Sequence, residues 1–248
     1  MRIPALRQML LVVLAGLAGP GCAKEELMMH KADVHEAFPD ERIAELADAV
    51  ADGDRDRVRR LASTTALDAK GDDDVTLLQW AVLNSSLSGL EALLEAGADP
   101  SLQGMDGYTV MHTAALVKDP KFLELLLDRR ISPDIRNREG QTPLFAAITG
   151  KRDAQFDALI AAGADVNATD SVEDTPLHIA ASTNDASRVL TLLHAGANPS
   201  AVNRQRATFQ DYLFQIDTRM LNEKSKQDRE AIRAWLLTHK VPFNNNGS

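Results

Sequence analysis

Hydrophobic positions along this chain recur with a period of about 33 residues. A threonine opens each period, and the five copies are Thr76, Thr109, Thr142, Thr175 and Thr208. Leucine, alanine and other apolar residues follow each threonine at helical spacing. Seventeen residues after each of the first four threonines stands an apolar pair, as at residues 93–94 and 126–127. Each period therefore predicts two short helices, and the whole pattern predicts a stack of repeats rather than one closed core.

The residues at the helix ends support this interpretation. Threonine is well suited to begin the first helix, because its hydroxyl can accept from a free backbone N–H. A glycine follows the second helix at Gly97, Gly163 and Gly196, where a left-handed cap is expected. Arg130 takes that place in one unit, so the cap there is expected to be strained or shifted.

One copy of the pattern is nearly complete. Residues 175–180 read T-P-L-H-I-A, and this motif with a 33-residue period is the ankyrin signature. The chain resembles the ankyrin-repeat family from about residue 40 to about residue 243. The resemblance implies an all-α solenoid of helix-turn-helix units with finger loops, capped at both ends. In that family the motif histidine is buried and bonds the adjacent turn, so His112 and His178 are expected to be structural.

The domain organisation follows from where the pattern starts and fades. We expect a signal peptide at 1–21, a lipidated N-terminus and flexible tether at 22–39, an ankyrin domain at 40–243 and a disordered tail at 244–248. Within the domain we expect an N-terminal cap at 40–69, full repeats at about 70–201 and a C-terminal cap at 202–243.

The C-terminal cap departs from the period. Its second helix is expected late, around residues 228–239, with Ile232, Trp235 and Leu236 facing inward. This unit carries about eleven extra residues, which form either a longer cap or a partner-specific extension.

The N-terminus has the features of a secretory signal. Arg2 and Arg7 precede an apolar core at Met9–Ala18, which is too short to span a membrane. Cys22, the single cysteine, stands at the cleavage site and resembles the lipidated cysteine of bacterial lipoproteins. This predicts a periplasm-facing lipoprotein, with the outer membrane favoured. The alternative is cleavage after Ala23, which would release a soluble periplasmic protein.

The segment between the signal and the repeats is polar and without strong periodicity. It contains Met28, Met29, His30 and His35, and these residue types can bind copper. One short run is not a ligand set, so we expect a plain linker and no metal or other cofactor.

The formal net charge is −9, and loss of Arg2 and Arg7 with the signal would leave −11. This charge argues against nucleic acid as a partner, because nucleic-acid binding needs basic patches. It favours a protein partner with a basic face. Asp72, Asp73 and Asp74 on the first finger loop are candidates to contact such a face; a solvated loop or a weak cation site are the alternatives.

In the ankyrin family, partners bind a concave surface made of finger-loop tips and of the positions seven and eight residues after each threonine. Apolar residues occur at several of these positions in the first two full repeats, which predicts an exposed apolar patch ringed by acidic loops. The alternative is that they pack locally. The predicted partner-binding residues are Leu83, Asn84, Met105, Asp106, Tyr108, Leu116, Val117, Thr149, Asp72, Asp73, Asp74 and Arg138.

The sequence also resembles ankyrin lipoproteins of Gram-negative bacteria, some of which are proposed antidotes to type VI secreted lipases. The resemblance is carried by Cys22, the Phe38-Pro39 lead-in, the T-L-L-Q-W-A variant at residues 76–81 and the Trp235 helix. It implies a protein that binds and occludes a secreted toxin, and we expect this protein to be a monomer. The alternative is a scaffold or chaperone-like factor for a resident envelope protein. No nucleophile with a base, phosphate loop or metal-ligand spacing is present, so catalysis is not expected.

Overall fold

The computed structural model describes residues 34–243 as helices, turns and loops. The described part of the chain contains no β-strand and a single isolated bridge, between Lys70 and Thr76. Two compact units are distinguished by their internal contacts, the first ending at Arg138 and the second beginning at Glu139. The expected signal peptide at 1–21, the lipidation site Cys22 and the expected tail at 244–248 lie outside the described residues. The all-α repeat fold predicted from the 33-residue period is confirmed.

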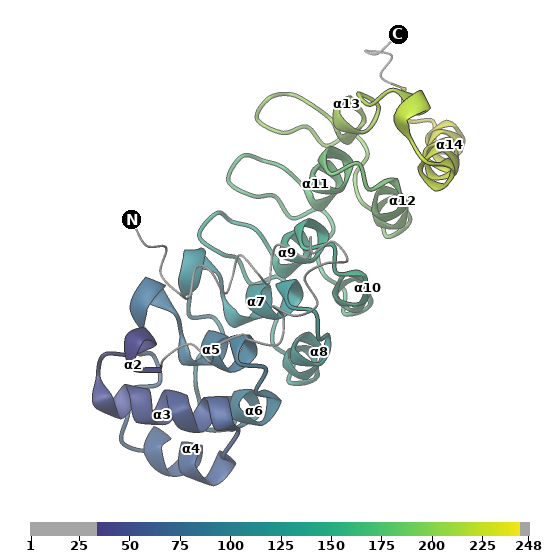
Figure 1. Ribbon diagram of the computed structural model, residues 1–248. Helices are drawn as coiled ribbons and strands as arrows, with labels where there is room; N and C mark the ends of the chain where they lie inside the picture. Colours follow the sequence, from purple (N-terminus) through teal and green to yellow (C-terminus); the bar gives the residue numbers. More distant parts are fainter. Residues whose placement is uncertain (1–33, 244–248) are drawn as a thin grey trace. The chain divides into compact units, whose positions relative to one another are not determined.

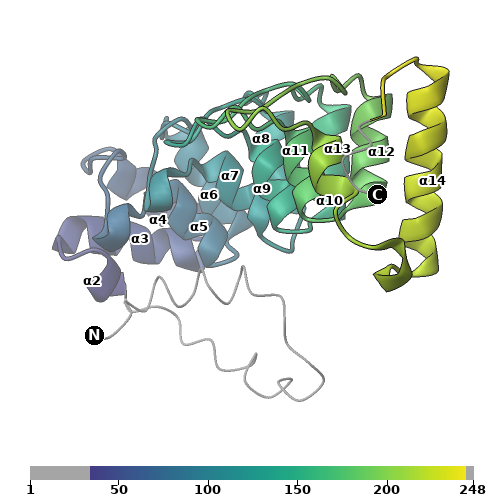
Figure 2. The same ribbon diagram turned by 90° about the horizontal axis from the view of Figure 1, so that it is seen from above.

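In the first unit the helices form two rows, with α3, α5 and α7 in one and α4, α6 and α8 in the other (Figures 1 and 2). The bounds are α2 Val34–Ala37, α3 Glu41–Asp52, α4 Arg55–Ala62, α5 Leu77–Leu83, α6 Leu87–Glu95, α7 Val110–Leu116 and α8 Lys121–Asp128. Two single 3₁₀ turns, η2 Asp72–Asp74 and η3 Met105–Gly107, lie on finger loops and contact each other. The fingers therefore stack as the helices do.

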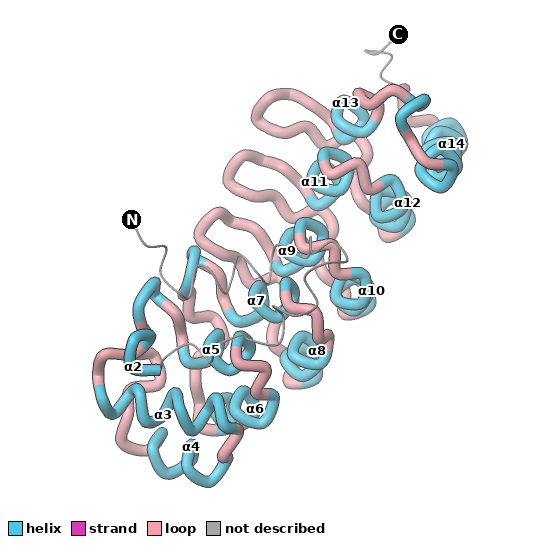
Figure 3. Tube along the Cα trace, in the orientation of Figure 1, coloured by secondary structure: helices cyan, strands magenta, loops and turns pink. Residues whose placement is uncertain are grey.

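The second unit repeats this arrangement, with α9, α11 and α13 in one row and α10, α12 and α14 in the other. The bounds are α9 Pro143–Thr149, α10 Asp153–Ala161, α11 Pro176–Ser182, α12 Ala186–His194, α13 Phe209–Leu213, η4 Thr218–Met220 and α14 Glu223–Thr238. Long loops precede α11 and α13 and project from the row of helices that contains α9, α11 and α13 (Figure 3). They are joined by a bond from the Arg204 N–H to the Val172 carbonyl (3.1 Å).

A threonine stands at the start of the first helix in each full repeat and in the C-terminal cap, as predicted. Thr76, Thr109, Thr175 and Thr208 exchange hydrogen bonds with the residue three positions further on. The hydroxyl of Thr142 makes no such bond, so the predicted hydroxyl cap is missing there. The Thr175 N–H donates to Nδ1 of His178 (3.1 Å), whose Nε2 bonds the Ala207 carbonyl of the next repeat (3.0 Å). His178 is buried, so the expected structural role is confirmed. In the first full repeat Gln79 takes the same place: its Oε1 accepts from Thr76 N–H (3.2 Å) and its Nε2 donates to the Tyr108 carbonyl (3.2 Å). A polar side chain at this position thus ties one repeat to the next.

One repeat has no polar side chain at this position. Phe145 stands where the other repeats have histidine, glutamine or aspartate, and it is buried. The hydroxyl of Thr142 is also buried and has no hydrogen-bond partner among the described residues. A buried hydroxyl without a partner costs free energy. This repeat therefore relies on apolar packing more than its neighbours do.

The caps after the second helices are left-handed, as predicted. Gly97, Gly163 and Gly196 have φ of 94°, 80° and 92°, and a Cβ at any of them would meet no atom within 4 Å. Space is therefore not what favours glycine there; the backbone conformation is. Arg130 adopts φ of 58° at the equivalent place, so the expected strain at this cap is present.

The folded region begins earlier than the predicted boundary at residue 40. Residues Val34–Ala37 form α2, which packs on α3. Phe38 is 1% exposed and meets the edge of the buried Trp80, with ring centroids 5.4 Å apart. The tether prediction is therefore wrong for residues 34–39, because Phe38 fills a core position that no repeat period reveals.

The C-terminal cap also differs from its prediction. Its helix α14 begins at Glu223, five residues before the expected start. Ile232 and Leu236 are buried as expected, whereas Trp235 is only partly buried and stacks on His239 at a centroid distance of 3.9 Å. The inward placement of Trp235 was therefore wrong, because the ring finds its partner one helical turn along its own helix.

A group of ion pairs connects α4, α6 and the residue after α8, which belong to the same row of helices in the first unit. Glu95 on α6 accepts hydrogen bonds from Arg55 (2.6 Å) and Arg59 (3.0 Å) of α4, and Arg129 after α8 lies 3.5 Å away. The hydrogen bond from Arg59 is the main cause that lowers the pKa of Glu95. A lowered carboxylate pKa adds stability that is present above the ordinary carboxylate pKa and is lost as the pH falls through the lowered one. These side chains are in part solvent-exposed, so the contribution is screened by salt.

Candidate protein-binding surface

The fingertips of the first unit gather carboxylates. Asp72, Asp73 and Asp74 form η2, and Asp106 lies in η3, which contacts η2. All four side chains are exposed. Asp73, Asp74 and Asp106 have positive φ, a left-handed conformation that aspartate tolerates better than most residues. The loop geometry therefore places like charges together, and we name these four residues the acidic fingertips.

Arg138 lies beside the acidic fingertips on the next loop. Its N–H donates to the Gly107 carbonyl (3.2 Å), and its side chain is exposed. Gly107 has a positive φ, and a Cβ there would come within 2.5 Å of the Arg138 Cβ. Only glycine allows this approach. The contact sets one basic group at the border of a negative surface.

The predicted apolar patch is not exposed. Leu83, Met105, Leu116 and Val117 are only 5%, 3%, 2% and 8% exposed. Leu83 and Leu116 are the last residues of α5 and α7, which are short helices packed along their whole length. The prediction of an exposed patch was wrong, because the alternative that these side chains pack locally holds. A charge introduced at Leu116 would report on folding and not on binding.

Three other candidates keep some exposure but are held by neighbours. Asn84 follows the last residue of α5 and donates from Nδ2 to the Trp80 carbonyl (3.0 Å). Tyr108 is half-buried and stacks on the His112 ring at a centroid distance of 5.5 Å. Thr149, in the second unit, is exposed and donates to the Phe145 carbonyl (2.8 Å). In the first unit, the exposed candidates that remain are the acidic fingertips and Arg138.

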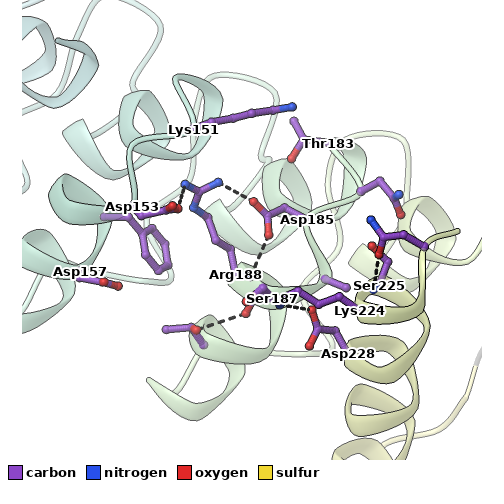
Figure 4. Close-up of a pocket in the computed structure, with 15 residues that line it drawn as sticks. Lys151, Asp153, Asp157, Thr183, Asp185, Ser187, Arg188, Lys224, Ser225 and Asp228 are labelled. Carbon is purple, nitrogen blue, oxygen red and sulfur yellow. Dashed lines mark hydrogen bonds and ion pairs between the residues drawn. The ribbon is translucent and has the colours of Figure 1, made fainter. Parts of the chain in front are cut away.

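The second unit has a polar pocket of 480 Å³ that the sequence did not predict. It lies where α10, α12 and α14 begin, and the close-up shows Arg188 between Asp153 and Asp185 (Figure 4). Arg188 is 6% exposed, bonds both carboxylates and lies over the Phe156 ring at 5.5 Å. The 33-residue period aligns Arg188 with three residues of the other repeats that are all buried, Gln155, Phe122 and Gly89. This alignment is the one feature of the sequence that could have indicated a buried position for Arg188.

Most charges in this pocket are already paired. Lys224 bonds Asp228 (2.7 Å), and this hydrogen bond is the main cause that raises the pKa of Lys224. The lining contains carboxylates and cations in similar number, among them Asp157 and Lys151. The pocket therefore favours neither an anion nor a cation.

The described residues contain no group of three or more His, Cys, Asp or Glu placed to hold a metal ion. Of the hypothetical copper ligands, Met28, Met29 and His30 lie outside the described residues and His35 lies in α2. None of the described helices is both long and apolar enough to cross a membrane.

The two rows of short paired helices and the stacked fingers define a repeat solenoid whose exposed loops, rather than a cleft, present the candidate surface. The family model for ankyrin repeats matches residues 86–170 and 111–203, so the solenoid contains ankyrin repeats over residues 86–203. These repeats indicate a protein-binding role. The chain is also 47% identical over 60 residues to Protein PhlB of Serratia liquefaciens. The aligned segment is 24% of this chain and 26% of that protein, so the chain spans about a quarter of the length of this curated relative.

Proposed function

We propose that this chain is an ankyrin lipoprotein of the bacterial envelope that binds and occludes a periplasm-acting toxin, such as a type VI secreted lipase. The repeats indicate protein binding. The envelope location is supported by Arg2, Arg7, the apolar stretch Met9–Ala18 and Cys22. The immunity role is supported by the resemblance to ankyrin lipoproteins with that proposed role.

The acidic fingertips carry the proposal. Four exposed carboxylates on two adjoining loops create a negative potential that attracts a basic surface and speeds association. The loops are held by backbone bonds, from Gly71 N–H to the Val75 carbonyl (2.8 Å) and from Gly104 N–H to the Tyr108 carbonyl (2.7 Å). A surface that is ordered before binding loses little entropy when the complex forms. The mechanism is occlusion, in which the fingers cover a basic surface that the toxin needs for its substrate or its membrane.

The fingertip site is tested by neutralising it. We expect Asp→Asn at 72, 73, 74 and 106 to lower the association rate constant for the captured toxin by about tenfold at low salt. The wild-type mature chain would first be used to capture the partner from periplasmic extracts, and the rate would be measured by surface plasmon resonance.

The matched control removes the same charge elsewhere in the first unit. Glu36→Gln, Glu45→Gln, Glu124→Gln and Asp128→Asn together neutralise four exposed acidic residues on α2, α3 and α8. Equal rates for the two quadruple variants would refute the fingertip site. Capture of a resident envelope protein, with no loss of toxin resistance when the chain is deleted, would refute the immunity role and favour a scaffold.

The anchor is tested separately. We expect the wild-type chain in the membrane fraction, with lipid on Cys22 detected by mass spectrometry. Two acyl chains or one chain with a second signal are needed for stable anchoring. Cys22→Ala should therefore move the chain to the soluble periplasmic fraction. An unmodified Cys22, or a variant that fractionates as the wild type does, would contradict the lipoprotein assignment.

A further inference from the structure

The C-terminal cap holds a buried cation without a countercharge. Arg229 on α14 is 1% exposed. Its Nη1 donates to the Ile216 carbonyl (2.9 Å) and its Nη2 to Oδ1 of Asn184 (2.7 Å). Both acceptors are neutral, and Nε has no partner among the described residues. Burying a guanidinium without a carboxylate is costly, so this arrangement needs an explanation.

A second arginine makes the local charge more positive. Arg233 lies one turn further along α14, and both guanidinium groups lie over the Phe214 ring, at 5.8 Å for Arg229 and 5.1 Å for Arg233. Burial lowers the pKa of Arg229, and the neighbouring Arg233 lowers it further. The carboxylate that pairs with Arg233 is Glu230, which is itself exposed. A positive charge is therefore left over in this cluster.

The geometry of Arg233 leaves room for a ligand. Glu230 accepts from Nη1 alone, and the described residues provide no partner for Nε and Nη2. These two groups form the edge of the guanidinium that binds a carboxylate with two parallel hydrogen bonds. The Arg233 side chain is 36% exposed, so a partner can reach it.

Apolar side chains border the same cluster. Ile216 is 40% exposed and Phe243 is 38% exposed, although both are large and hydrophobic. Phe243 lies against Phe214, with ring centroids 5.0 Å apart, and Arg233 lies 5.7 Å above it. Its segment is held by the bond from Nε2 of Gln210 to the Pro242 carbonyl (3.0 Å). Exposed aromatic and aliphatic groups around an arginine are typical of the centre of a protein interface.

The loop between α13 and α14 belongs to the extra residues of this unit. Residues 215–220 are all exposed, so the loop covers little of the core. Arg229 nevertheless fixes it through Ile216. A loop that only capped the stack would be expected to bury its apolar residues. We propose that Arg233, backed by Arg229 and bordered by Ile216 and Phe243, docks a carboxylate side chain flanked by apolar residues on a protein partner.

The probe is the capped peptide acetyl-Leu-Glu-Phe-amide, with its glutamine counterpart as the neutral control, titrated into the full mature chain by NMR. We expect the glutamate peptide to bind about tenfold more tightly than the glutamine peptide. Arg233→Gln should abolish this difference. Arg219→Gln, which removes an 88% exposed arginine from the same loop, should leave it unchanged. Equal affinities of the two peptides for the wild type, or an unchanged preference in Arg233→Gln, would overturn the proposal.

Arg229→Met separates docking from a structural role. Replacing a buried charge with an apolar side chain of similar length should raise the Tm by about 2–4 °C, while the preference for the glutamate peptide falls. A variant with a lower Tm and an unchanged preference would show that Arg229 serves the fold alone. That result would also overturn the proposal. Neither outcome depends on the acidic fingertips, so a failure here is distinct from a failure of the proposed function.

Discussion

Trp80→Ala should lower the free energy of unfolding of the first unit by about 3–5 kcal/mol, the usual cost of truncating a large buried aromatic side chain. Trp80 is 1% exposed. Its Nε1–H donates to the Ala47 carbonyl of α3 (2.9 Å), and its ring meets Phe38. The variant therefore loses core packing, a buried hydrogen bond and the ring contact that holds Phe38, in the segment before α3, against the core. Urea unfolding followed by far-UV circular dichroism measures the change.

The control for this prediction is Trp80→Phe. It keeps an aromatic ring but removes the Nε1–H, so we expect a loss of about 1–2 kcal/mol. The two variants should also differ at Phe38, which keeps an aromatic neighbour only in Trp80→Phe. Protease cleavage near Phe38 should therefore rise strongly in Trp80→Ala and little in Trp80→Phe. Equal stability of the two variants would contradict the view that Trp80 fastens the N-terminal segment.

His178→Ala should lower the free energy of unfolding of the second unit by about 2–3 kcal/mol, because the hydrogen bonds of the imidazole to Thr175 and to the Ala207 carbonyl are lost and the Thr175 groups are left buried without that partner. Nδ1 is the acceptor for the Thr175 N–H, and Nε2 bonds the Ala207 carbonyl of the next repeat. The Asn203 N–H also donates to the Ala207 carbonyl (3.1 Å), and this bond, which the variant keeps, limits the loss. Thermal unfolding of the variant and the wild type gives the difference.

His178→Gln is the informative comparison, because the first full repeat already has a glutamine, Gln79, at the equivalent position. Gln79 accepts from the Thr76 N–H with Oε1 and donates to the Tyr108 carbonyl with Nε2. These two bonds correspond to those that His178 makes with Thr175 and with the Ala207 carbonyl of the next repeat. We expect glutamine at 178 to recover all but about 1 kcal/mol of the stability lost in His178→Ala. If His178→Gln were as unstable as His178→Ala, the imidazole would contribute through ring packing, including its contact with Tyr212, and not through hydrogen bonds.

The acidic fingertips illustrate what could be predicted of the candidate surface. Aspartates between two helical stretches are polar loop residues in any fold, so their exposure could be foreseen. That η2 and η3 adjoin also follows from the period, because residues one repeat apart occupy equivalent places in a stack. The burial of Leu116 and Val117 could not be predicted, because the helical pattern shows which residues are apolar but not how much of a short helix is covered by its neighbours.

The sequence by itself determined the repeat, its length, the threonine caps and the structural place of the motif histidines. These features depend on neighbours within about four residues, or on copies one period away, and both are visible in a linear pattern. The tertiary structure alone decided that Phe38 seats against Trp80, that Leu116 is covered, and that Arg188 and Arg229 are buried. Each of these depends on which side chains from distant segments exclude water at one point in space, and that information is not carried by local periodicity.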